Sequence, residues 1–437
     1  MKKEKKAILG WALYDWANSA FATTVMSGFF PLFFKQYWSF GVDVNASTAR
    51  LGFGNAAAGL MVALMAPILG TVADKGSCRK KFLILFAYIG VLATAALYFI
   101  EKGAWVFALF FYAIGVIGFS GANIFYDALL PDISNEKNID TVSGFGFSLG
   151  YLGGGLLFLF NVIMVLYPGF FGIGDAAKSV QIGFLSVSIW WGLFTLFIIK
   201  WTPEKKEPQP EKNGLPVAES IRQLKETFGK IKKMKPVFLF LIAYWFYIDG
   251  VDTIIRMAVD YGMSLGFGSN DLITALLITQ FVGFPAALLF GMLGQRWGAK
   301  KGIFVAIWVY MAVTVWGAMM DHKTEFYILA IVVGLVQGGI QALSRSYYAR
   351  LIPSDQPAEF FGFYNMLGKF AAIIGPFMMG AVGLMVRRIL LPPDPTSQQL
   401  MAVGRLASRW SISSVLILFI VGGVLLWFVD EKDLKDH

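Results

Sequence analysis

The sequence predicts an all-α membrane protein in which twelve transmembrane helices form two pseudo-symmetric six-helix halves. Hydrophobic residues fill 57% of the 437 positions and charged residues only 15%, too few to cover a soluble protein. The apolar residues form runs of about 20 or more, the length that a helix needs to cross a bilayer. The second half also repeats motifs of the first, as expected when two helical bundles are copies of each other.

Each long apolar run is expected to form one helix, and the longest helices must tilt or extend into water. The expected ranges are 8–38, 51–73, 82–100, 104–130, 144–166, 180–201, 236–263, 271–295, 302–320, 326–351, 362–390 and 406–429. Residues 1–201 then form the N-terminal half, residues 202–235 a cytoplasmic linker and residues 236–437 the C-terminal half.

The linker is rich in proline, lysine and glutamate at its start and amphipathic at its end. Ile221, Leu224, Phe228 and Ile231 are spaced along one face of a helix, between lysines and arginines. This pattern predicts a helix that lies at the cytoplasmic membrane surface. A helix that binds a protein partner is the alternative.

Lysine and arginine gather in the connections that follow even-numbered helices, and Arg387, Arg388 and Arg405 are the exception. By the positive-inside rule, both termini are therefore expected in the cytoplasm. We expect a multi-pass protein of the plasma (inner) membrane if the source is bacterial. The net charge of +9 then reflects topology, and we expect no nucleic-acid partner.

Cysteine and histidine are scarce, which restricts the chemistry. The single Cys78 excludes an internal disulfide, and the two histidines lie in a loop and at the C-terminus. We therefore expect no metal site and no cofactor. Because no nucleophile–base constellation is visible, we do not expect an enzyme. The expected partners are a small-molecule substrate, membrane lipid and protons, and we expect a monomer.

The first expected helix carries Asp15 and Asn18 three residues apart, so both lie on one helical face. A carboxylate inside a membrane helix costs roughly 2.5–3.5 kcal/mol on insertion scales, and it normally faces protein or water. This face therefore predicts a polar pathway. The alternative is that Asp15 only fastens the helix to a neighbour.

The same stretch resembles a known family. Leu13–Phe21, with the sequence Leu-Tyr-Asp-Trp-Ala-Asn-Ser-Ala-Phe, is similar to the start of the vacuole-effluxer-like branch of the major facilitator superfamily. That branch contains fungal vacuolar amino-acid effluxers and bacterial relatives of unassigned substrate. The resemblance implies the major facilitator fold, in which helices 1, 4, 7 and 10 line a central cavity.

Polar side chains occur in the helices that this fold assigns to the cavity and in the eleventh helix. Besides Asp15 and Asn18, the candidates for the substrate pathway are Asn123, Asp127, Gln337, Gln341, Arg345 and Lys369. They carry both signs of charge, which suits a zwitterion such as an amino acid.

The seventh expected helix contains Asp249, Asp252 and Arg256, spaced three and four residues apart and therefore on one face. The spacing favours an Asp252–Arg256 pair and leaves Asp249 as the expected proton carrier. Asp15 is the alternative carrier. A fixed salt bridge that only aids folding is the other interpretation of this face.

Two helix ends resemble the loop motif of the superfamily. The first copy contains Gly70, Asp74 and Arg79, and the second contains Gly291, Gln295 and Arg296. An anionic Asp74 can bind the N-terminus of a helix from the other half, and we expect this contact near Gly362. Because Gln295 replaces the acid, such a gate should be asymmetric.

Together these features predict a secondary active transporter that moves a small polar solute by alternating access. We expect an amino acid or a related metabolite as the solute and protons as the coupling ion, with sodium as an alternative. A receptor or scaffold on a transporter fold that does not itself transport is the second hypothesis.

Overall fold

The computed structural model describes residues 3–42, 44–75, 78–203, 217–264, 267–353, 355–394 and 396–430, and these form helices and their connections. The chain divides into two compact units. Unit 1 contains Met1–Phe228 and Ile352–Met366. Unit 2 contains Gly229–Leu351 and Leu367–His437.

Unit 1 begins with α1 (Lys3–Ala20), which continues as a wider π-helical stretch, Phe21–Phe29, then α2 (Phe30–Phe33) and a second π-helical stretch, Phe34–Trp38. These segments form one long helical rod over the expected first helix. The other helices of unit 1 are α3 (Val44–Lys75), α4 (Arg79–Ala96), α5 (Trp105–Ala128), the short α6 (Leu130–Ile133), α7 (Ile139–Leu166) and α8 (Ala176–Trp201). The linker helix α9 (Val217–Lys233) crosses the unit boundary between Phe228 and Gly229.

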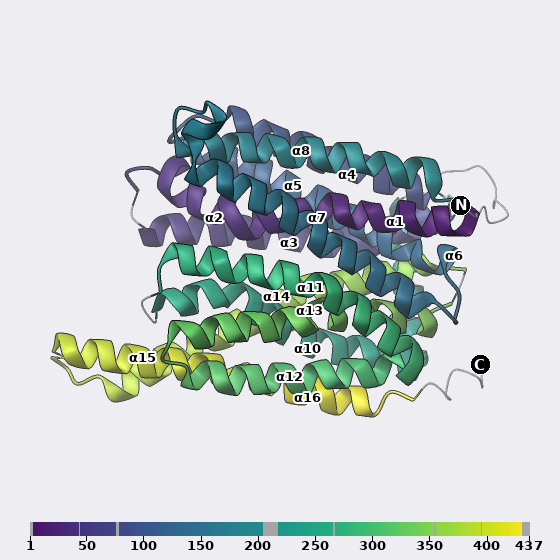
Figure 1. Ribbon diagram of the computed structural model, residues 1–437. Coiled ribbons are helices and arrows are strands. Elements are labelled where there is room, and N and C mark those ends of the chain that lie inside the picture. Colours follow the sequence, from purple (N-terminus) through teal and green to yellow (C-terminus); the bar gives the residue numbers. More distant parts are fainter. Residues whose placement is uncertain are drawn as a thin grey trace. The chain divides into compact units, whose positions relative to one another are not determined.

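Unit 2 contains most of the remaining helices (Figure 1). They are α10 (Lys235–Ser264), α11 (Ser269–Trp297), α12 (Ala299–Met319), α13 (Lys323–Leu351), α14 (Pro357–Leu390), α15 (Ser397–Ser414) and α16 (Leu416–Trp427). The start of α14, up to Met366, belongs to unit 1. Each of the twelve expected helices therefore has a counterpart, and the last is divided at Val415 into α15 and α16.

The two units repeat the same helix packing. In unit 1, α1 packs on α8, and both α3 and α4 pack on α5. In unit 2, α10 packs on α16, and both α11 and α12 pack on α13. These pairs correspond when the six helices of one unit are matched in order to those of the other. The prediction of two pseudo-symmetric six-helix halves is confirmed.

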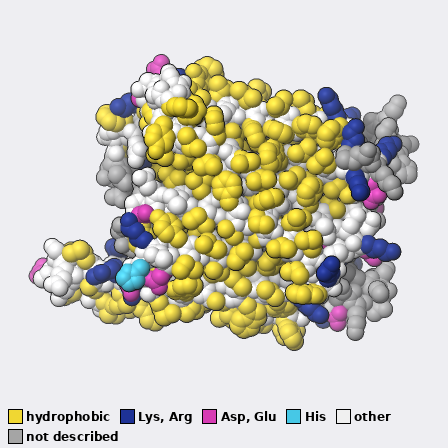
Figure 2. All heavy atoms as spheres, viewed as in Figure 1, with side chains coloured by type: hydrophobic (Ala, Val, Ile, Leu, Met, Phe, Trp, Pro, Cys, Tyr) yellow, Lys and Arg dark blue, Asp and Glu magenta, His cyan; other side chains and the backbone are white. Residues whose placement is uncertain are grey.

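Among the described residues, eleven helices are long and apolar enough to cross a membrane. Large apolar side chains on their outer faces are exposed, for example Leu92 of α4 and Trp308 of α12. Figure 2 shows hydrophobic side chains spread over the sides of the helices and most lysines and arginines near the helix ends. Contiguous apolar surface of this kind suits contact with lipid.

Close contact between α1 and α7 depends on glycine. A Cβ atom at Gly150 would lie 2.6 Å from Ser19 Oγ and 2.9 Å from Asp15 Oδ1. A Cβ atom at Gly153 would lie 2.6 Å from the carbonyl oxygen of Trp16. Small residues here allow two membrane helices to approach closely, and they fix Asp15 against α7.

Several helix boundaries differ from the expected ones: α3 begins at Val44, α7 at Ile139 and α15 at Ser397, ahead of the expected 51, 144 and 406. Helix α14 begins at Pro357, five positions before residue 362, because its first turn is the polar Pro357-Ala-Glu segment that precedes the apolar run. The two units divide inside α9, and residues 352–366 are grouped with unit 1. The division into residues 1–201, 202–235 and 236–437 stays a prediction.

Candidate functional site

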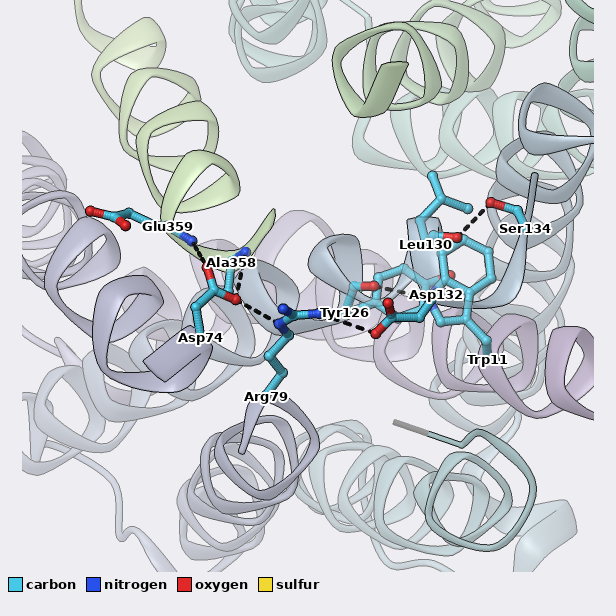
Figure 3. A network of polar contacts seen from close by, with 9 residues as sticks. All are labelled: Trp11, Asp74, Arg79, Tyr126, Leu130, Asp132, Ser134, Ala358 and Glu359. Atoms are coloured by element: carbon cyan, nitrogen blue, oxygen red, sulfur yellow. Dashed lines mark hydrogen bonds and ion pairs between the residues drawn. The ribbon is translucent and has the colours of Figure 1, made fainter. Parts of the chain in front are cut away.

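Asp74, at the end of α3, binds the first turn of α14. Its Oδ1 accepts a hydrogen bond from the backbone N–H of Ala358 at 3.1 Å, and its Oδ2 accepts one from Glu359 at 2.7 Å (Figure 3). These N–H groups lie where a helix has no internal acceptor to offer, and the helix dipole favours a negative charge there. The Asp74 side chain is 5% exposed. We call this arrangement of Asp74, Ala358 and Glu359 the Asp74 cap.

Arg79 at the start of α4 neutralises the cap. Its Nε lies 2.6 Å from Asp74 Oδ1 and its Nη1 lies 3.1 Å from Asp132 Oδ2 in α6. Figure 3 shows the guanidinium between the two carboxylates. Because Arg79 is buried, removing its guanidinium would take the shared cation from both carboxylates, at a cost of about 3–5 kcal/mol.

Gly70 makes the Asp74 cap sterically accessible. A Cβ atom at this position would lie 2.2 Å from the carbonyl oxygen of Ala358. Gly362 lies one turn further along α14, where a Cβ atom would be 2.7 Å from the carbonyl oxygen of Ala66. We expected the partner of Asp74 near Gly362, but Ala358 and Glu359 donate the hydrogen bonds because α14 begins earlier.

The second copy of the motif, at the end of α11, has a different environment. Gly291 is buried, Gln295 is half-buried and Arg296 is exposed. Close packing in this copy occurs at Gly294, where a Cβ atom would lie 2.3 Å from the side chain of Leu343 on α13. The position equivalent to Asp74 therefore carries a neutral, half-buried side chain near the end of α11.

A polar cluster joins α1 to α5 inside unit 1. Asp15 accepts hydrogen bonds from Ser19 Oγ at 3.1 Å and from the Tyr126 hydroxyl at 3.2 Å. Asn18 Nδ2 donates to Asn123 Oδ1 at 2.6 Å. The sequence-predicted Asp15, Asn18 and Asn123 thus lie in one region, and both carboxylate oxygens of Asp15 have donors.

An aromatic pair supports this cluster. The rings of Trp11 and Tyr126 stack with centroids 4.3 Å apart, and Trp11 Nε1 donates to the backbone oxygen of Tyr126 at 2.9 Å. The next residue, Asp127, accepts a hydrogen bond from Asn365 Nδ2 of α14 at 3.2 Å. Asn365 lies in the part of α14 that belongs to unit 1.

Unit 2 contains a buried carboxylate in α10. Asp249 Oδ1 accepts hydrogen bonds from the backbone N–H of Gly375 at 3.0 Å and from Thr253 Oγ1 at 3.2 Å. Its Oδ2 is buried and has no hydrogen-bond partner among the residues that the structure describes. A Cβ atom at Gly375 would overlap Thr253 Oγ1, so only glycine allows this approach.

The neighbouring charges are more exposed. Arg256 Nη2 lies 4.0 Å from Asp252 Oδ2, the outer limit of an ion pair, and the two side chains are 46% and 24% exposed. Lys369 of α14 interacts electrostatically with both. On α13, Gln337 and Gln341 are half-buried, while Arg345 is buried. Asp249 is therefore completely buried, whereas Asp252 and Arg256 on the same helix are partly exposed.

Sequence reasoning missed several partners in these networks. Tyr126 precedes Asp127 as Tyr14 precedes Asp15, and this repeated pair was the available signal. Thr227 lies within the apolar stripe of α9, where a polar residue is unusual. Asp132 and Glu359 had no distinctive pattern. Within the described residues, no group of three or more histidine, cysteine, aspartate or glutamate side chains is placed to hold a metal ion.

Solved structures of other proteins share this fold. The human organic anion transporter MFSD10 superposes with a TM-score of 0.73 at 12% identity, covering 98% of this chain and 100% of that chain. The proton:xylose symporter XylE gives a TM-score of 0.65 at 13% identity, covering 99% and 98%. With its two matching six-helix units, the chain has the fold of the major facilitator superfamily.

Sequence comparison identifies the family within this class. The family described as "Vacuole effluxer Atg22 like" matches residues 39–386, and the chain belongs to this family. The uncharacterized MFS-type transporter YxiO of Bacillus subtilis (strain 168) is 40% identical over 442 residues, covering 100% of this chain and 97% of the relative. Autophagy-related protein 22 of Yarrowia lipolytica is 23% identical and covers 78% and 72%. The family resemblance stated from Leu13–Phe21 is confirmed.

Proposed function

We propose that the protein is a secondary active transporter that moves a small polar solute across the membrane by alternating access. The observation that carries this proposal is the Asp74 cap. It holds the first turn of α14 against α3 within unit 1, while α14 from Leu367 onward belongs to unit 2. A bond at this position keeps the cytoplasmic side closed and breaks when that side opens.

The surroundings of Asp74 suit a contact that forms and breaks repeatedly. The Arg79 guanidinium lies 2.6 Å from the carboxylate and is a partner that we expect to stay when the N–H groups of Ala358 and Glu359 leave. The negative charge is thus never left without a partner, which lowers the free energy needed to open the cap.

The substrate that we propose is an amino acid or a related metabolite. Two observations support this class: the family is described as vacuole effluxers, and the candidate pathway side chains include both carboxylates and cations. Asp15 and Asp127 suit an ammonium group, and Arg345 and Lys369 suit a carboxylate. An amino acid carries both an ammonium group and a carboxylate.

We propose protons as the coupling ion and Asp249 as the carrier. Its Oδ2 is the buried carboxylate oxygen without a donor among the described residues, so a proton there would remove a negative charge from an apolar helix. Sodium is the alternative outcome of the coupling experiment.

The experiment has two stages. Purified protein is first heated in the presence of each common amino acid, because a ligand that binds the folded state at 100 times its Kd stabilises it by about 2.7 kcal/mol. Compounds that raise the Tm are then tested for uptake into proteoliposomes, with and without a proton gradient, against protein-free liposomes. Uptake above this control supports transport. A ligand that binds tightly but does not cross would instead favour the receptor hypothesis.

A further inference from the structure

Glu359 takes part in two interactions at the start of α14. Its backbone N–H donates to Asp74 Oδ2 at 2.7 Å, which is half of the Asp74 cap. Its carboxylate Oε1 accepts a hydrogen bond from Thr227 Oγ1 of the linker helix α9 at 2.5 Å. Both Glu359 and Thr227 have 0% exposure. The same residue thus connects the cap to the linker.

A second contact between α9 and α14 lies one turn further on. The ring of Phe228, next to Thr227, stacks on the ring of Phe363, with centroids 6.2 Å apart. Phe363 follows Glu359 by four residues, so the two α14 side chains share one helical face. All four residues belong to unit 1. The linker helix therefore contacts two successive turns of α14 directly beside the Asp74 cap.

Burial makes the Thr227–Glu359 hydrogen bond energetically significant. A hydroxyl on the apolar face of an amphipathic helix is removed from water, and so is the Glu359 carboxylate. Loss of the Thr227 hydroxyl removes one hydrogen bond from a buried carboxylate, and a buried polar group that loses a hydrogen bond is destabilised. The bond should consequently persist for as long as the first turn of α14 keeps its place against Asp74.

The two helices joined by the Thr227–Glu359 bond, α9 and α14, are also helices in which the chain passes from one unit to the other. The chain passes between the units in α9 at Phe228 and Gly229, and in α14 at Met366 and Leu367. The Thr227–Glu359 bond joins these two helices. A change in the position of the linker helix would therefore act on the first turn of α14 directly.

We infer that Thr227 is a positioning residue of the Asp74 cap and that the linker helix α9 sets how often the cap opens. The hydroxyl holds the first turn of α14 where Asp74 can accept from its N–H groups. The consequence for gating rests on the proposed transport function. The positioning itself does not, because it can be measured without any substrate.

Hydrogen–deuterium exchange of the full-length protein in lipid nanodiscs tests the inference. The amides of Ala358 and Glu359 have no acceptor within their own helix, so their protection depends on Asp74. Thr227→Val removes the hydroxyl at nearly constant size. It should accelerate exchange of the 357–363 peptide by about threefold to tenfold, the loss expected for one buried hydrogen bond.

Two controls separate positioning from general stability. Thr227→Ser keeps the hydroxyl and should exchange like the parent. Asp74→Asn should accelerate exchange by itself, and adding Thr227→Val should give no further acceleration. Parent-like exchange in Thr227→Val would overturn the inference, and so would equal acceleration in the middle of α5. If Thr227→Val behaves as expected in a protein that transports nothing, the inference stands and the transport proposal fails.

Discussion

The two units share their helix packing, but their buried acidic residues lie at different positions and have different numbers of hydrogen-bond donors. In unit 1, Asp74 is buried with three donors, and each oxygen of Asp15 has a donor. In unit 2, the position of Asp74 is taken by the neutral, half-buried Gln295. There, the buried acid is Asp249 in the middle of α10, and one of its oxygens has no partner among the described residues.

This difference favours separate roles for the acidic residues of the two repeats. A carboxylate whose oxygens all accept hydrogen bonds from fixed donors is stabilised as an anion, which suits a helix cap. A buried carboxylate with one free oxygen has room for a proton, which suits ion coupling. In this interpretation, unit 1 supplies the gate and unit 2 supplies the coupling site.

The largest expected effect comes from Asp74→Asn. The amide keeps the shape of the side chain but loses the charge that Arg79 and the start of α14 both bind, so the transport rate should fall by at least about tenfold. Substrate affinity should change by less than about threefold, because the cap binds no solute. Initial uptake rates and thermal-shift titrations measure the two quantities. Gln295→Ala in the second repeat is the matched control and should stay near the parent rate. An unchanged rate in correctly inserted Asp74→Asn protein would remove the gate.

A smaller effect is expected from Gly70→Ala. The added methyl would lie 2.2 Å from the carbonyl oxygen of Ala358, so α14 must shift away from α3. Overpacking of this kind costs about 1–3 kcal/mol, and we expect a lower Tm with faster amide exchange at residues 358 and 359. Gly59→Ala on the same helix is the control, since a Cβ there meets nothing within 4 Å. Identical behaviour of the two variants would show that α3 and α14 are not in contact.

The smallest effect should follow Gln295→Glu, which restores an acid to the second repeat. A charge near a helix end contributes about 0.3–1 kcal/mol, so the uptake rate should change by less than about fivefold. Rates are compared at equal protein density in proteoliposomes. A change larger than that of Asp74→Asn would mean that the second repeat contains the main gate.

The sequence predicted the positions of charge better than the partners of each charge. Asp15 and Asp249 were identifiable because an acid within an apolar run is costly unless it faces protein or water. Asp74 was identifiable from the loop motif at the end of the second expected helix. Their partners depend on contacts between distant parts of the chain, such as Thr227 and Glu359, which are 132 residues apart. Such contacts leave no local pattern.

Helix boundaries show the same limit. The start of α14 was expected at residue 362, where the apolar run begins, but Pro357 and a polar first turn open the helix earlier. The apolar run indicates which residues face lipid or protein. The first turn of α14 depends instead on Asp74, which accepts hydrogen bonds from its N–H groups. Pro357 was the local signal, because proline is common at the first position of a helix.

The pH dependence of uptake by Asp74→Asn and Asp249→Asn, measured side by side in proteoliposomes, tests these separate roles most directly. Asp249→Asn should lose the pH dependence of uptake while keeping part of its ligand binding and counterflow. Asp74→Asn should keep the parent's profile at a lower rate, and Asp252→Asn should keep it as well. If Asp249→Asn transports with the same pH profile as the parent, Asp249 is not the coupling site and the account is contradicted.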